Sequence, residues 1–143
     1  MKKGYLFLCL LFLASCAMSG QKTGALPTTS RAKAHINQPD AAGKTPLMFA
    51  AQNISNAEII QTMVRKGANP NQQDHRGWTA LTWAVVYNKN PKVISALLKQ
   101  GADPNILTYT GNRPIDFAKN NKALLHTSDF QLLQSLTVKR EGD

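Results

Sequence analysis

The feature that most constrains this chain is a pattern that recurs every 34 residues. Gly43, Gly77 and Gly111 mark the same position in three successive copies. The copies read GKTPLMFA at residues 43–50, GWTALTWA at 77–84 and GNRPIDFA at 111–118. A second block keeps the same spacing, with GANPN at 67–71 and GADPN at 101–105. Self-similarity at one fixed period predicts a repeat architecture, in which each copy is one structural unit stacked on the next.

Within each period the local signals describe a pair of helices. Thr45 and Thr79 are suited to cap a first helix, and Pro46 is suited to its first turn. Gly67 and Gly101 then end a second helix, where a left-handed residue is needed. Apolar residues at helical spacing give that second helix a buried stripe in two copies: Ile59, Ile60, Met63 and Val64, then Val93, Ile94, Leu97 and Leu98. The pattern predicts an all-α fold.

These motifs resemble the ankyrin repeat, whose pattern runs G-x-T-P-L-H-x-A-A, then an apolar second helix, then G-A-D-x-N. The resemblance covers about residues 36–136 and implies a short ankyrin-repeat solenoid of about three helix-turn-helix units with β-turn fingers. The expected units are 43–76, 77–110 and 111–136, followed by a charged tail at 137–143. Met48, Thr82 and Asp116 stand where the family has histidine, so we expect a local side-chain bond to be lost there.

The two ends of the array differ from its middle. The third unit lacks the Gly-Ala close, and its second helix, expected at about 129–136 behind a Ser128 cap, starts late. Such a unit is typical of a terminal cap. At the other end, residues 28–35 offer no helix pair. We therefore expect the outer side of the first unit to be weakly covered.

The N-terminal residues have the features of a targeting segment. Lys2 and Lys3 precede an apolar run at residues 5–14, which is shorter than the roughly 20 residues that span a bilayer. The run ends in LASC at 13–16, which resembles the lipobox of bacterial lipoproteins. That resemblance implies a signal peptide at 1–15 and a lipid on Cys16, with residues 16–35 as lipidated cysteine and flexible tether. Cys9 lies in the leader, so we expect no disulfide in the mature chain.

The residue after the cysteine indicates a location. In lipoproteins of enteric-type bacteria an Asp at this position favours retention in the inner membrane. Ala17 stands here, which favours the outer membrane, facing the periplasm, with the inner membrane and the cell surface as alternatives.

The basic charge of the chain does not indicate a nucleic-acid partner. The formal charge of +9 falls to +7 without Lys2 and Lys3, and the remaining charges are scattered along the sequence. A nucleic-acid-binding protein usually gathers its cations on one face. We therefore expect no nucleic-acid partner, while weak attraction to anionic lipid headgroups fits the composition.

No motif in the sequence predicts catalysis. A nucleophile elbow, a phosphate loop, paired zinc spacing and a dinucleotide fingerprint are all missing from it. The histidines lie in predicted loops without partners at ligand spacing: His35, His75 and His126. Asp40, Asp74 and Asp103 occupy family positions that hold turns together. We expect neither an enzyme nor a metal or other cofactor.

The ankyrin resemblance implies a membrane-anchored module in the bacterial envelope that binds an unidentified protein with its finger tips and the concave face of its first helices. Family positions that vary most give the candidate partner-binding residues: Lys44, His75, Arg76, Trp78, Tyr87, Tyr109 and Asn112. Trp and Arg on one turn are types enriched in binding hot spots. The alternative is that Trp78 folds back onto its own helix or the neighbouring finger. Phe49, Trp83 and Phe117 share one repeat position and are predicted to form a buried, stacked column.

Other functions stay open from the sequence alone. One is an inhibitor or immunity-type protein that masks a specific envelope enzyme or toxin, which a neighbouring gene for that target would indicate. Another is a structural envelope protein that binds anionic lipid or glycan, which salt-sensitive liposome binding would indicate. A third is an enzyme or metal carrier, which metal analysis of the purified protein would test.

Overall fold

The computed structural model describes residues 35–137, which belong to the compact unit that begins at Arg31. In this part of the chain the helices follow one another in pairs. They are α3 Pro46–Asn53 and α4 Ala57–Arg65, α5 Ala80–Tyr87 and α6 Pro91–Lys99, then α7 Pro114–Ala118 and α8 Ser128–Leu136. The predicted leader, Cys16, the tether up to residue 34 and the tail from residue 138 lie outside the described residues.

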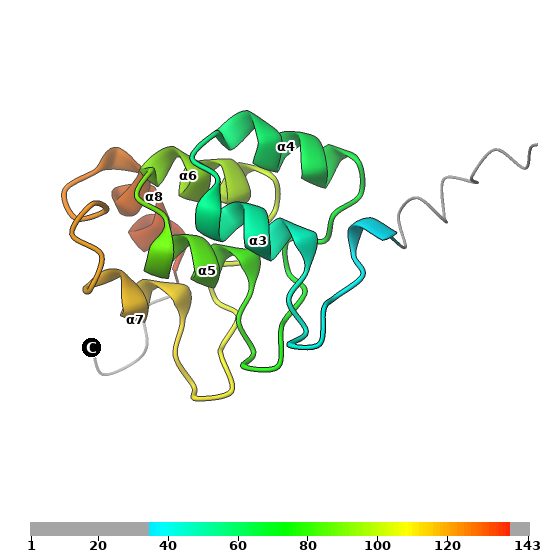
Figure 1. Cartoon of the computed structure of the whole chain (residues 1–143). Helices are drawn as coiled ribbons and strands as arrows, with labels where there is room; N and C mark the ends of the chain where they lie inside the picture. The colour runs from blue at the N-terminus through cyan, green and yellow to red at the C-terminus, as the bar shows by residue number, and fades with distance from the viewer. Residues whose placement is uncertain (1–34, 138–143) are drawn as a thin grey trace, which may run out of the picture. The chain divides into compact units, whose positions relative to one another are not determined.

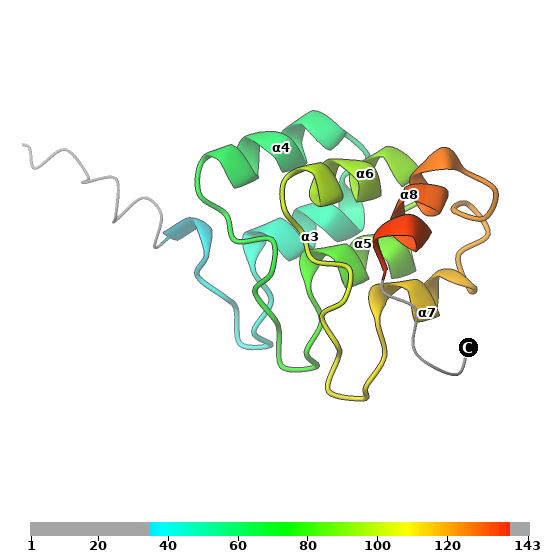
Figure 2. The same cartoon turned by 180° about the vertical axis from the view of Figure 1, so that it is seen from behind.

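The helices form two layers (Figures 1 and 2). In the inner layer α3 packs on α5 and α5 packs on α7, while in the outer layer α4 packs on α6 and α6 packs on α8. Loops project from the inner layer on one side, and we call them finger 1 (residues 37–44), finger 2 (71–78) and finger 3 (105–112). The predicted all-α solenoid of helix pairs is confirmed.

Side-chain caps set the starts of the helices. Thr45 and Thr79 cap α3 and α5 as predicted, with Oγ1 accepting a backbone N–H at 3.3 and 3.4 Å. Asn56 and Asn90 cap the outer helices α4 and α6 in the same way. Helix α8 is capped by Thr127 rather than by the predicted Ser128, because the Thr127 hydroxyl accepts the N–H three residues further on at 3.2 Å.

The expected loss of a local bond at the missing histidines is wrong in all three units, since in the middle one the Thr82 and Thr79 hydroxyls are hydrogen-bonded at 3.3 Å. Met48 Sδ accepts the Thr45 N–H at 3.4 Å, and Asp116 Oδ2 accepts the Arg113 N–H at 2.7 Å. Both side chains occupy the third helical position, from which a flexible thioether or a carboxylate reaches back to the residue before the helix. Residues that replace the family's histidine therefore also form a local hydrogen bond at the start of the helix.

Each finger is held together by one side chain at its base. Asp40 Oδ1 accepts two backbone N–H groups of finger 1 at 2.8 and 2.9 Å, and Asp74 Oδ1 does the same in finger 2. Asp103 Oδ1 accepts one N–H at 2.8 Å ahead of finger 3. The prediction that these carboxylates hold turns is confirmed. Finger 3 itself carries Thr108, whose hydroxyl accepts the Asn112 N–H at 3.2 Å.

Neighbouring fingers are hydrogen-bonded to each other. The His75 N–H donates to Ala42 O at 3.2 Å, and the Tyr109 N–H donates to Arg76 O at 3.1 Å. Gly77 makes this close approach possible, since its φ is +76° and a Cβ there would lie 2.6 Å from the Tyr109 nitrogen. The fingers thus form one connected surface.

Burial is concentrated in the middle pair of helices. Six side chains are buried in each of α5 and α6: Ala80, Leu81, Thr82, Trp83, Ala84 and Val85, then Val93, Ile94, Ser95, Ala96, Leu97 and Leu98. Helix α4 buries Ile60 and α8 buries Leu133, each as its single buried residue. Ile59 of α4 is 40% exposed although the aligned Val93 of α6 is fully buried. The outer side of the first unit is weakly covered, as expected.

A buried amide in the loop after α5 joins it to the preceding unit. Asn88 is 2% exposed, and its Nδ2 donates to Ala51 O at 2.8 Å and to Ile54 O at 3.0 Å. Asn121 repeats the arrangement one unit later, donating to Val85 O at 2.8 Å and to Asn88 O at 2.9 Å. These amides satisfy the carbonyls at the ends of the inner helices, which have no partner within their own helix.

Candidate binding surface

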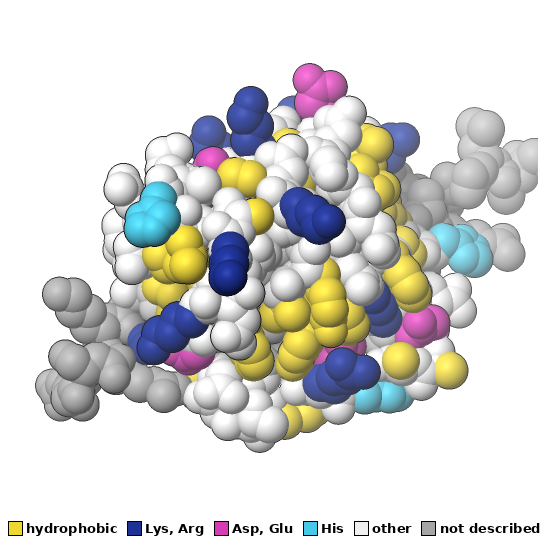
Figure 3. Space-filling view, turned by 60° about the vertical axis from the view of Figure 1, so that its left-hand side comes forward, with side chains coloured by type: hydrophobic (Ala, Val, Ile, Leu, Met, Phe, Trp, Pro, Cys, Tyr) yellow, Lys and Arg dark blue, Asp and Glu magenta, His cyan; other side chains and the backbone are white. Residues whose placement is uncertain are grey.

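Finger side chains lie between the aromatic residues on the inner helices. Lys44 Nζ lies 4.2 Å from the ring centre of Phe49 and 3.6 Å from that of Trp83. The ring centre of Trp78 lies 5.0 Å from that of Trp83 and 5.3 Å from that of Phe117. We call these five residues, in the order Phe49, Lys44, Trp83, Trp78, Phe117, the interleaved row. Figure 3 shows hydrophobic side chains gathered in its lower middle part, at the level of the inner helices.

The row follows one rule along the array. Lys44 and Trp78 occupy the same repeat position, and each packs on the aromatic ring of the next unit. Lys44 comes from finger 1 and reaches Trp83 of α5, while Trp78 comes from finger 2 and reaches Phe117 of α7. Each of these finger residues therefore joins its own unit to the following one.

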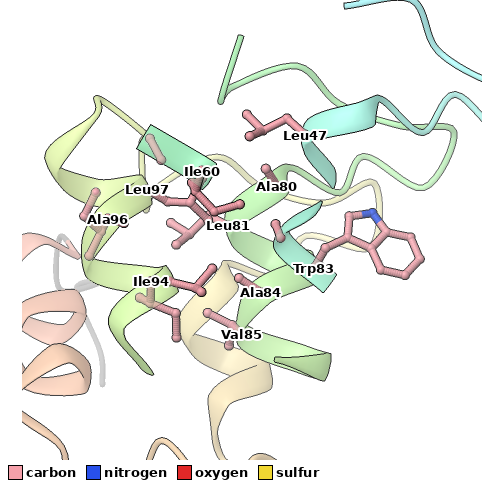
Figure 4. Packing of buried hydrophobic residues seen from close by; sticks show 14 of the residues in the cluster. Leu47, Ile60, Ala80, Leu81, Trp83, Ala84, Val85, Ile94, Ala96 and Leu97 are labelled. Atoms are coloured by element: carbon pink, nitrogen blue, oxygen red, sulfur yellow. The ribbon is translucent and has the colours of Figure 1, made fainter. Parts of the chain in front are cut away.

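The predicted buried column of Phe49, Trp83 and Phe117 is wrong in part. Trp83 is 8% exposed and Phe117 is half-buried, but Phe49 is 45% exposed. Figure 4 shows the Trp83 ring pointing away from the buried Leu81 and Leu97. This repeat position faces the fingers, not the outer helices, so its ring is covered only where a finger residue of the preceding unit lies over it. Phe49 has no such residue within the part of the chain that the structure describes.

Asp74 fixes the position of the central ring. Its Oδ2 accepts the Trp83 Nε1–H at 3.0 Å, while its Oδ1 holds the backbone of finger 2. The carboxylate is 3% exposed, so these charge-assisted hydrogen bonds are shielded from water. Finger 2 and helix α5 are thereby held as one rigid element.

Lys44 is covered, unlike the other candidate residues. It is 8% exposed, and its ammonium contacts Gln52 Oε1 as well as the two rings. Burial lowers the pKa of Lys44 by disfavouring the charged form. The carboxylates of Asp40 and Asp74 act in the opposite direction, and the charge of Arg76 adds to the lowering. The cation is therefore a built-in member of the row.

Three candidate residues present large exposed side chains beside the row. The Arg76 guanidinium lies 5.6 Å from the ring centre of Trp78 and 5.7 Å from that of Trp83. Tyr87, near the end of α5, is 47% exposed and its ring stacks on Trp83 at 5.4 Å. Tyr109 of finger 3 is 72% exposed. Together they make an aromatic and cationic surface across two units.

The remaining candidates lie on the fingers or within the row. His75 is exposed on finger 2, and Asn112 is half-buried on finger 3, where its Nδ2 donates to a neighbouring hydroxyl at 3.0 Å. Trp78 is half-buried and contacts Trp83 and Tyr87 of the following helix. These contacts agree with the alternative prediction for Trp78, in which its side chain folds back onto its own helix.

The sequence did not single out Leu107, which is 47% exposed on finger 3. Its carbonyl accepts a hydrogen bond from Gln73 Nε2 at 2.9 Å, which links fingers 2 and 3. An alignment of the repeats would have drawn attention to Leu107, because this apolar residue stands on a finger where the preceding repeat has the polar Gln73.

The described residues bring together no group of three or more His, Cys, Asp or Glu side chains that could hold a metal ion. None of the helices in residues 35–137 has the length and apolar character needed to cross a membrane.

Stacked helix pairs with hydrogen-bonded fingers define a solenoid repeat protein. A family model described as ankyrin repeats, in three copies, matches residues 9–108, which is more than half of the chain. The chain therefore belongs to the ankyrin-repeat family, as predicted. The match begins inside the segment predicted as a leader and ends before α7. A comparison with curated proteins finds no match. Ankyrin repeats are typically non-catalytic modules that bind other proteins.

Proposed function

We propose that this chain is a non-enzymatic binding module whose partner protein contacts the fingers and the inner helices around the interleaved row. The observation that carries the proposal is the distribution of exposed aromatic side chains. Among the described residues, Phe49, Tyr87 and Tyr109 are the exposed aromatics, and all three lie on this side of the repeat stack. An aromatic surface beside an exposed arginine has the composition of a binding hot spot.

The rigidity of this surface supports the proposal. Tyr87 rests on Trp83, which is fixed by Asp74, and Arg76 lies over the same rings. A surface that is ordered before binding loses little conformational entropy when a partner docks. The partner's binding energy is then not spent on ordering these side chains.

The test is a truncation of the exposed side chains only. A crosslinked pulldown from intact envelopes identifies the partner, and its affinity is then measured for the combined Arg76→Ala, Tyr87→Ala and Tyr109→Ala variant. We expect a loss of about 2 kcal/mol or more, roughly 30-fold in Kd, with little change in melting temperature. Trp78 is left intact, because its truncation would remove two ring contacts of the row.

The matched control removes exposed apolar side chains elsewhere. Ile59→Ala with Leu136→Ala truncates residues that are 40% and 47% exposed on the outer helices. This variant should bind the partner like the parent chain. Equal affinity for the parent and the Arg76, Tyr87 and Tyr109 variant would place the partner on another surface.

We also propose that the chain is a lipoprotein of the bacterial envelope, anchored through Cys16 and held at the outer membrane on its periplasmic side. The support is the LASC motif after a short apolar run, with Ala17 behind the cysteine. Two acyl chains bind a membrane far more firmly than one. Cys16→Ser should abolish labelling by radioactive palmitate and leave an uncleaved precursor. Normal processing of the variant, with unchanged membrane fractionation, would contradict the proposal.

A further inference from the structure

We infer that the outer helices form a second interaction surface, which lies against the anionic headgroups of a lipid bilayer. We define the outer surface as α4, α6 and α8 with the loops on either side of them, excluding the fingers and the inner helices. Of the lysines and arginines in residues 35–137, only Lys44, Arg76 and Arg113 belong to the inner helices and fingers. The others all lie on the outer surface: Arg65, Lys66, Lys89, Lys92, Lys99, Lys119 and Lys122.

The carboxylates do not follow this distribution. Within the same residues, Glu58, Asp103 and Asp129 belong to the outer surface, and an equal number lie on the fingers and inner helices. The outer surface therefore carries seven cations against three carboxylates, whereas the charges of the fingers and inner helices balance. Figure 3 shows several dark-blue side chains over the upper part of that view, where Figure 1 places the outer helices, and others in its middle and lower parts.

The outer cations are available to an external partner. All of them are exposed to solvent. Within the described residues the ion pair is that of Arg113 with Asp116, at 3.8 Å on the inner side, and it involves none of these cations. A bilayer with anionic lipids attracts each such cation by its surface potential, and the attractions accumulate.

A groove crosses this surface between α4, α6 and α8. It has a volume of about 370 Å³ and places Lys92 and Lys99 beside Gln61 and Ser95, with Asp129 as its single acidic lining residue. A space of this volume, lined by two lysines, admits a phosphate-bearing headgroup. The groove therefore adds a local binding place to the general attraction.

The residue types favour a bilayer over a nucleic acid. Proteins that bind single strands stack bases on aromatic side chains, and sequence readers use arginine on base edges. All the exposed aromatics of the described residues lie on the opposite side, and six of the seven outer cations are lysines. Exposed Ile59 and Leu136 supply apolar contact at a headgroup boundary. Lysines spread over several elements match a planar anionic surface.

The test compares vesicle binding by matched charge variants. The chain from residue 16 onward, carrying Cys16→Ser so that neither the apolar leader nor an acyl chain contributes, is added to vesicles of phosphatidylglycerol and phosphatidylcholine in equal parts. We expect binding that weakens as salt is raised and is lost on phosphatidylcholine alone. Lys92→Gln with Lys99→Gln should weaken it by about fivefold for each cation removed, or about 25-fold. Arg76→Gln, which removes one charge from the finger side, should leave vesicle binding unchanged.

The outcomes separate this inference from the proposed protein-binding function. The Lys92 and Lys99 variant should still capture the partner protein, whereas Arg76→Gln should weaken that capture. The inference is overturned if the variant with both lysines replaced binds vesicles like the parent, or if Lys92→Gln alone and Arg76→Gln weaken vesicle binding equally. Binding to duplex DNA without binding to the vesicles would also overturn it and assign the surface to nucleic acid.

Discussion

The middle helix pair and the first helix pair contain closely similar sequence patterns but bury very different amounts of apolar surface. Helix α6 buries six of its residues, whereas α4 buries only Ile60. The aligned residues Val93 and Ile59 are fully buried and 40% exposed, respectively. The difference lies in neighbours: α6 packs between α4 and α8, and α4 packs on α6. In a repeat stack, the stabilising effect of a residue depends on its position in the array as much as on its type.

The largest expected effect tests this dependence with a truncation to alanine at two aligned positions. Val93→Ala in α6 shortens a fully buried side chain, so we expect the free energy of unfolding to fall by about 1.5–3 kcal/mol. Ile59→Ala in α4 truncates the aligned side chain, which is 40% exposed, and should cost less than about 1 kcal/mol. Denaturant titration of both variants measures the difference. Equal losses would mean that the first unit is as well packed as the middle one.

A smaller effect compares the fingers. Gly77 and Gly111 have φ values of +76° and +78°, so an alanine at either position is strained by about 1–2 kcal/mol. A Cβ at Gly77 would also lie 2.6 Å from the Tyr109 nitrogen, whereas one at Gly111 would meet no described atom within 4 Å. Gly77→Ala should therefore destabilise the chain by about 1 kcal/mol more than Gly111→Ala. Thermal melting of the two variants gives the comparison, and a larger loss at Gly111 would contradict the finger contact.

The smallest effect concerns pH and compares Lys44 with Trp78, its equivalent in the next unit. Burial lowers the pKa of Lys44 from its ordinary value of 10.5. Between that lowered pKa and 10.5 the folded chain binds fewer protons than the unfolded chain, so Lys44 makes stability rise with pH through this window. Lys44→Met places an uncharged side chain there, as Trp78 is uncharged one unit later, and should remove this rise. Chemical denaturation across alkaline pH tests it; identical slopes for parent and variant would show that burial leaves Lys44 unaffected.

The sequence predicts the architecture well because the repeat signals are local. Threonine caps, the proline after Thr45 and the glycines after the outer helices each act within one or two turns of chain. The structure bears these out. A repeated local signal is enough to specify a helix pair, and stacking follows because each pair must cover its apolar side.

The surface is less predictable because it depends on contacts between units. Lys44 occupies a repeat position at which a partner-binding residue is expected. It is nevertheless buried, because it packs on the Trp83 ring of the next unit. Phe49 shares its repeat position with Trp83 but is 45% exposed, because no finger residue of a preceding unit covers it within the described residues. Asn88 lies in a polar loop, and nothing local indicates that its amide reaches the carbonyls of Ala51 and Ile54. Such contacts depend on which residues the neighbouring unit carries, so the sequence of one repeat cannot predict them.

The interleaved row also gives the protein a built-in optical reporter. The chain contains two tryptophans, Trp78 and Trp83, and both belong to this row. Indole emission responds to nearby charge and to water, and here the rings lie beside the Lys44 ammonium and the Arg76 guanidinium. A ligand that covers the row or displaces either cation should shift the fluorescence spectrum of the unlabelled chain. Occupancy of the outer helices should leave that spectrum largely unaltered, so the colour of the emitted light distinguishes which of the two sides is engaged.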